Sequence, residues 1–116
     1  MASKNKNQEL VNDVAKYFNG AESLYEASKV VYKQLELDLL RETVHKLSIA
    51  LMKLNKIQSH EYDEERKKVW DLKDELKKIE LEDNESVDYT VRFKVHDALL
   101  CVRSIVMFGK NYHRDF

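Results

Sequence analysis

The chain has 116 residues, which is the size of one domain. Hydrophobic residues make up 43% of it and charged residues 35%, with no Pro and two Gly, so it is too apolar for disorder and too poor in turn residues for an all-β fold. The formal net charge of -1 excludes the strong overall field of a nonspecific DNA-binding protein or an acidic DNA mimic. We expect one helical domain over residues 1–116, with flexible ends at 1–6 and 110–116.

Helical periodicity first becomes clear near the N-terminus. A first helix is predicted from about Asn7 to Asn19, with Leu10, Val14, Phe18 and Ala21 on one side. Asn19-Gly20 then offers residues suited to a left-handed helix end. The first helix is therefore expected to be short.

A long second helix is predicted to begin at the capping-box pair Ser23 and Glu26 and to reach Ile57. Its second half has a heptad stripe formed by Leu40, Val44, Leu47, Leu51 and Leu54. Its first half has another phase, because Leu24, Val31 and Leu35 lie on a different stripe. The region from Leu35 to Leu40 is therefore expected to twist, to kink or to divide the helix in two.

Two more helices complete the expected fold. The third opens near Ser59 and has a stripe formed by Tyr62, Val69, Leu72, Leu76 and Ile79. The fourth is expected to have Ser86 and Asp88 in its first turn, to run to Phe108 and to stop at Gly109, with a stripe formed by Val91, Val95, Ala98, Val102 and Ile105. Short connections favour antiparallel neighbours, so the sequence predicts an all-α, up-and-down four-helix bundle.

The single Cys101 excludes an internal disulfide framework. The polar residues 1–8 contain no apolar stretch that could act as a signal peptide. Charges interrupt every apolar run before it reaches the roughly 20 residues that cross a bilayer. These features predict a cytoplasmic protein without membrane contacts.

The sequence contains few residues arranged to bind a metal ion or to act as a nucleophile. Glu42-Thr43-Val44-His45 matches one Glu-x-x-His half-motif of di-iron bundle proteins, but a second copy is missing. With Val44 on the buried stripe, neither Glu42 nor His45 points inward. Cys101 lies among apolar residues without an activating base, and such surroundings raise a thiol pKa. We therefore expect no metal, no cofactor, no small-molecule substrate and no enzyme activity.

The last third of the chain carries the candidate contact residues. One flank of the fourth helix presents cations and aromatic rings at steps of three and four, and the residues after Gly109 add more. Arginine beside tyrosine is a common chemistry for binding phosphate and protein surfaces. The candidate partner-binding residues are Tyr89, Arg92, His96, Arg103, Tyr112, His113 and Arg114.

The charges of the last two helices are opposite. From Ser86 onward five Lys or Arg face three Asp, whereas between Ser59 and Glu85 eleven acids face six bases. Antiparallel packing would bring these two blocks together. The simpler expectation is that Arg92 and Arg103 pair with carboxylates of the third helix inside the monomer, and a stripe free for a partner is the alternative.

Arg92 and His96, one turn apart, resemble the Arg and His that HEPN ribonucleases, which are small helical bundles, carry on one helix. The family places more residues between the two than Phe93-Lys94-Val95. The resemblance implies RNA cleavage in which His96 handles the proton of the 2'-hydroxyl and Arg92 stabilises the charged phosphorus centre.

Phe93, Leu100 and Met107 recur every seven residues at positions of the fourth helix that should face water. One explanation is that the first helix lies across them. The other is an intermolecular surface, either a homodimer or a groove for another protein.

Together these patterns predict a small non-enzymatic protein-binding module, such as an inhibitor, antitoxin, immunity or adaptor protein. RNA binding or HEPN-like cleavage through Arg92 and His96 is the first alternative. A structural homo-oligomer built through Phe93, Leu100 and Met107 is the second.

Overall fold

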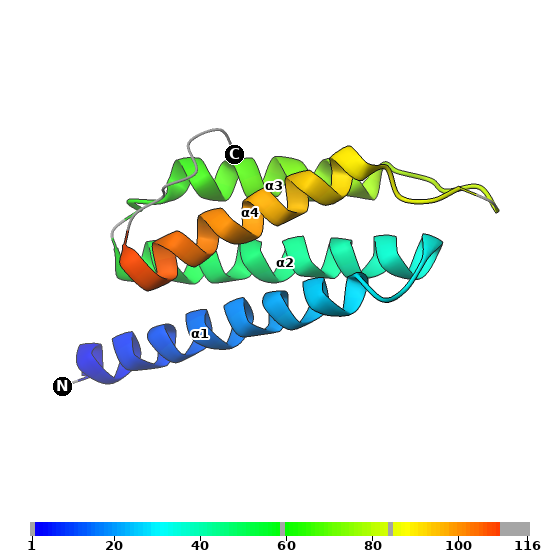
Figure 1. The fold of residues 1–116 in the computed structure, drawn as a ribbon. Helices are drawn as coiled ribbons and strands as arrows, with labels where there is room; N and C mark the ends of the chain where they lie inside the picture. Colours follow the sequence, from blue (N-terminus) through cyan, green and yellow to red (C-terminus); the bar gives the residue numbers. More distant parts are fainter. Residues whose placement is uncertain (1, 59, 84, 110–116) are drawn as a thin grey trace.

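The computed structural model describes residues 2–58, 60–83 and 85–109, and within these ranges it contains four α-helices and no β-strand. The helices are α1 (Ala2–Ser28), α2 (Lys33–Ile57), α3 (Asp63–Lys77) and α4 (Tyr89–Phe108). Successive helices run in opposite directions along the long axis of the molecule (Figure 1). The predicted all-α four-helix bundle is confirmed.

Helix α2 forms the centre of the bundle, because it packs against α1, α3 and α4. Four residues of its predicted stripe, Leu40, Val44, Leu47 and Leu51, have no exposed surface, and the fifth, Leu54, is partly buried. The predicted stripes of α3 and α4 face the same core. Among the described residues, no helix is both long enough and apolar enough to cross a bilayer.

The prediction of a short first helix is wrong. Helix α1 has 27 residues and is longer than the other three, and it contains Gly20 in its interior. Burial explains its length, because the stripe does not stop at Phe18 but continues through Ala21, Tyr25 and Ser28, which are all buried. Ending the helix at Asn19-Gly20 would turn these side chains away from the core. Tertiary burial therefore outweighs a local stop signal.

The predicted start of the second helix at Ser23 is also wrong, because α2 begins at Lys33. Ser23 and Glu26 lie inside α1, and Glu26 pairs with Lys29 rather than capping a new helix. The chain divides at residues 29–32, where the amide of Lys29 donates to the carbonyl of Glu26 over 3.2 Å and tightens the last turn of α1. The change of phase that the sequence shows near Leu35 therefore reflects two helices that meet earlier in the chain.

Polar groups fix the other connections. Between α2 and α3, the buried Asn55 accepts a hydrogen bond of 2.7 Å from the Tyr62 amide at the start of α3. The Tyr62 hydroxyl in turn donates to the carbonyl of Gly109 over 2.9 Å, which joins the start of α3 to the end of α4. Burial, assisted by Glu61, raises the pKa of Tyr62, so it remains a donor. The predicted helix opening at Ser59 lies outside the described residues.

The connection from α3 to α4 projects from one end of the bundle as a narrow loop (Figure 1). Helix α4 begins at Tyr89, so Ser86, which was predicted in its first turn, lies before the helix and Asp88 is the N-cap. The Asp88 carboxylate accepts from the amide and the hydroxyl of Thr90, both over 2.8 Å. These two hydrogen bonds lower the pKa of Asp88. Helix α4 ends at Gly109 in the left-handed conformation, with φ of 70°.

The two glycines should respond in opposite directions to Ala. Gly20 is helical with open space around its Cβ position, so Gly20→Ala should stabilise the fold by up to about 1 kcal/mol. Gly109→Ala places a side chain on a residue in the left-handed conformation and should destabilise the fold by about 1 kcal/mol. This loss is expected although the space around Gly109 is as open as that around Gly20. Urea unfolding of the two variants measures both changes. A loss of stability in Gly20→Ala would mean that α1 does end at Asn19.

Candidate functional site

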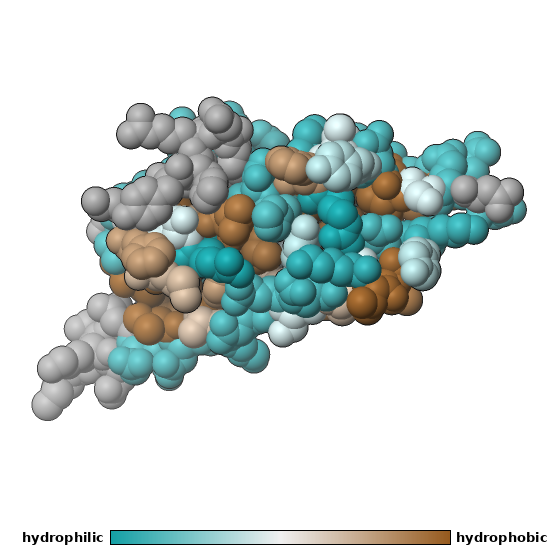
Figure 2. All heavy atoms as spheres, in the orientation of Figure 1, coloured by the Kyte–Doolittle hydropathy of each residue, from teal (hydrophilic) through white to brown (hydrophobic). Residues whose placement is uncertain are grey.

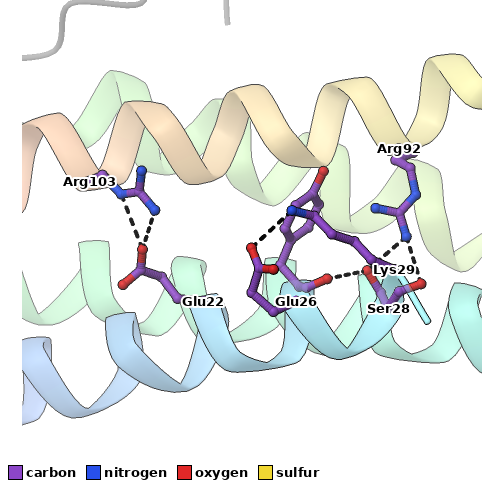
Figure 3. Close-up of polar contacts among 7 residues, drawn as sticks. Glu22, Glu26, Ser28, Lys29, Arg92 and Arg103 are labelled. Carbon is purple, nitrogen blue, oxygen red and sulfur yellow. Dashed lines mark hydrogen bonds and ion pairs between the residues drawn. The ribbon is translucent and has the colours of Figure 1, made fainter. Parts of the chain in front are cut away.

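The predicted contact residues of α4 split into two groups. The flank towards α1 holds Arg92, His96 and Arg103, whose side chains contact α1 and α2. Figure 3 shows Arg92 and Arg103 reaching from α4 towards Ser28 and Glu22 of α1. The face that points away from the bundle holds Tyr89 and the three apolar residues Phe93, Leu100 and Met107. The predicted contact residues Tyr112, His113 and Arg114 lie outside the described residues.

Arg92 closes the turn between α1 and α2. Its Nε donates to Glu36 Oε2 in the first turn of α2 over 2.9 Å, and its Nη2 donates to the carbonyl and the hydroxyl of Ser28 over 2.7 and 2.9 Å. Ser28 is the last residue of α1, so its carbonyl has no partner within the helix. The pair is well covered, with exposed side-chain fractions of 22% for Arg92 and 15% for Glu36. Arg92 therefore acts as a side-chain cap for α1.

Arg103 pairs with Glu22 on α1. It lies about two helix turns beyond His96 along α4, on the side away from Arg92. Both its Nε, over 3.1 Å, and its Nη2 donate to the same carboxylate oxygen (Figure 3). This pair is more exposed, at 42% for Arg103 and 32% for Glu22, so solvent weakens it more than the Arg92 pair.

Tyr25 lies between these two arginines and is the centre of the flank. Its ring stacks on the imidazole of His96 with ring centres 5.6 Å apart and an angle of 23°. The Arg92 guanidinium and the Lys29 ammonium each lie 5.3 Å from the centre of the same ring. Because Tyr25 is buried, His96 serves to cover its ring in this arrangement.

The expected pairing of Arg92 and Arg103 with the third helix is wrong in its partners. Both pair inside the monomer, but with α2 and α1. The register of α4 turns these arginines away from α3, which lies against its other flank. Among the described residues, Lys94 of α4 pairs with Glu75 of α3 over 2.8 Å.

The outward positions of α4 remain open to solvent. Tyr89, Phe93 and Met107 are 71%, 50% and 64% exposed, and Leu100 between them is half-buried. The rings of Tyr89 and Phe93 contact each other at 5.6 Å. The expectation that the first helix lies across these positions is wrong, because α1 packs mainly on α2 and leaves them uncovered. We call Tyr89, Phe93, Leu100 and Met107 the α4 outer face.

The space-filling view shows apolar residues over α4 on one face of the molecule (Figure 2). Over α4, brown and tan apolar atoms lie between teal hydrophilic groups on the face shown in Figure 2. Aromatic and methionine side chains in such positions are typical of protein contact surfaces. The α4 outer face can therefore offer apolar contacts, while the adjoining arginines are held by α1 and α2.

The residues that were weighed for metal or nucleophile chemistry form no metal cluster among the described residues. Among the residues that the structure describes, no three His, Cys, Asp or Glu side chains gather in a way that could hold a metal ion. Glu42 is exposed and His45 is half-buried. Burial, followed by the charge of Glu65, raises the pKa of the Cys101 thiol to about 12.

The predicted helices do not bring the partners of the flank together, because Tyr25 and Ser28 fall in the predicted second helix and Glu22 lies between the predicted first and second helices. Glu22 and Tyr25 follow Phe18 at helical spacing, and Ser28 continues the same stripe. The continuous alternation of steps of four and three from Val14 to Ser28 is the signal that could have found them.

Replacing Arg92 should be more destabilising than replacing Arg103. Arg92→Ala leaves Glu36 and the Ser28 carbonyl without their donors and should lower the free energy of unfolding by about 2 kcal/mol. Arg103→Ala makes the same charge change at a more exposed pair and should lower it by about 0.5 kcal/mol. Urea unfolding checks both values, and equal small losses would show that Arg92 does not hold the turn.

Cys101 should be unreactive in the folded protein. Its folded pKa of about 12 exceeds the ordinary 9.0, so the protonated thiol favours the native state up to about pH 9 and loses this effect as the pH rises towards 12. Iodoacetamide should modify the thiol much more slowly in the native protein than in urea at the same pH. Equal rates in the two conditions would contradict its burial.

Comparison with protein-family models, with characterised proteins and with solved structures gives no match for this chain. The functional argument therefore rests on the surfaces of this chain alone. Among those on and around α4, the α4 outer face has the clearest contact chemistry.

Proposed function

We propose that this protein is a small non-enzymatic protein-binding module that contacts its partner through the α4 outer face. The observation that carries the proposal is the exposure of Tyr89, Phe93 and Met107 on one side of a helix whose opposite side is fully packed. Aromatic and methionine side chains contribute large contact areas when a partner covers them. Inhibitor, antitoxin, immunity or adaptor roles in the cytoplasm fit a module of this kind.

The proposed contact surface differs from the one that the sequence predicts, because its centre is formed by apolar side chains of the α4 outer face and not by Arg92 and Arg103. Arg92 is engaged with Ser28 and Glu36 and supports the fold. Arg103 is more exposed and lies at the border of the α4 outer face, where it can serve as a polar rim. Lys94 lies on the other flank, half-exposed in its pair with Glu75.

RNA binding or HEPN-like cleavage remains the rival function. It needs Arg92 to bind a phosphate, but this guanidinium already donates to a carboxylate, a carbonyl and a hydroxyl. It also needs His96 free for proton transfer, whereas the imidazole stacks on Tyr25. The packing therefore favours protein contact over RNA cleavage.

A photo-crosslinking amino acid placed at Phe93 or at Met107 in living cells tests the proposal. We expect covalent adducts with one protein from both positions and none from the same group placed at Trp70, which is exposed on α3. Adducts with RNA would favour the rival function, and adducts with a second copy would favour the homo-oligomer. Equal labelling from all three positions would overturn the α4 outer face as a contact site.

The partner identified in this way, once purified, allows the affinity to be measured. Phe93→Glu and Met107→Glu should each weaken binding by about 30-fold or more, because hot-spot residues contribute about 2 kcal/mol or more each. Val11→Glu, which makes the same kind of change at an exposed apolar residue of α1, should alter it less than about twofold. The dissociation constant should depend only mildly on salt, whereas RNA binding would weaken steeply.

A further inference from the structure

A basic groove lies between α2 and α3, apart from the α4 outer face. Its volume is about 360 Å³, within the range of small-ligand sites. Two helices supply its walls, which are formed by Arg41, Glu42, His45, Lys73 and Lys77. Three of these side chains are permanent cations and one is a carboxylate, so the groove carries a positive charge.

Arg41 gives the groove a fixed cation. Its Nε donates to the carbonyl of Leu76 over 3.0 Å and its Nη2 to the carbonyl of Ile79 over 2.7 Å, which holds the guanidinium at the end of α3. Its Nη1 lies 3.5 Å from Asp38 Oδ1, a long and exposed contact. An arginine held by carbonyls keeps its full charge, because carbonyls are neutral.

The two lysines are a second source of positive potential. Lys73 and Lys77 are one turn apart on α3, a spacing at which like charges repel. Within the described part of the chain, neither lysine has an ion pair, although acidic residues are common on this helix. The Lys73 ammonium lies 4.3 Å from the centre of the Trp70 ring, which restricts its position without neutralising it. A bound anion would relieve this repulsion.

We propose that this groove binds inorganic hydrogen phosphate, with Lys73, Lys77 and His45 as donors to its oxygens and Glu42 as an acceptor for its remaining proton. Glu42 has no hydrogen bond or ion pair within the described residues, and it lines the groove beside the cations. A carboxylate accepts hydrogen bonds and donates none when ionised. It therefore favours a phosphate that keeps one proton over sulfate, which has none to give.

NMR titration of the full chain with inorganic phosphate at about pH 7.5 tests the site, with sulfate as the second probe. We expect saturable shifts at the amides around Arg41, His45 and Lys73, and an affinity for phosphate at least about tenfold higher than for sulfate. Lys73→Gln with Lys77→Gln should weaken phosphate binding at least about tenfold. Glu42→Gln should reduce the preference over sulfate to less than about twofold.

A matched control separates a site from the general field of the molecule. Lys67→Gln with Lys68→Gln makes the same charge change on the same helix, and neither residue lines the groove. This variant should bind phosphate within about twofold of the natural chain. Equal losses in both double variants, or shifts that do not saturate and are the same for phosphate and sulfate, would show an adventitious ion only and overturn the proposal. Neither result bears on the α4 outer face.

Discussion

The hydrogen bonds that Arg92 makes across the first turn hold three helices in register. The turn at residues 29–32 contains neither Gly nor Pro, so its own sequence does little to set its path. Arg92 joins the last residue of α1 to the first turn of α2 from a position on α4. Helix α2 can then pack against all its neighbours, and the buried stripe that forms the core follows from that placement.

Helix α4 divides its surface between three tasks. Val95 and Val102 face the core, and Arg92 and Arg103 join the helix to α1 and α2. The remaining side includes Phe93, whose aromatic ring is exposed to water. A charged side chain would be better solvated at this position. Because of this separation, fold stability and the proposed partner contact can be examined by different substitutions on one helix.

Periodic burial made much of the fold predictable, as the stripe through Val44 shows. Local signals failed at Gly20, because they carry less free energy than the burial of Tyr25 one turn later. The exposed side of α4 also followed from its period. The pairing of Arg103 with Glu22 did not, because these residues are 81 positions apart and meet only when non-consecutive helices pack.

Two helix ends of this protein are specified from a distance. The carbonyl at the end of α1 is satisfied by Arg92, 64 residues away. At the end of α3, Arg41 adds hydrogen bonds to the carbonyls of Leu76 and Ile79, 35 and 38 residues away, and the Leu76 carbonyl also accepts from the Ile79 amide. The segments that follow α1 and α3 therefore depend less on their own residues to end these helices. Their composition and length can drift during evolution, or be altered by insertion, with less effect on the helices than in bundles that rely on glycine or proline at each corner.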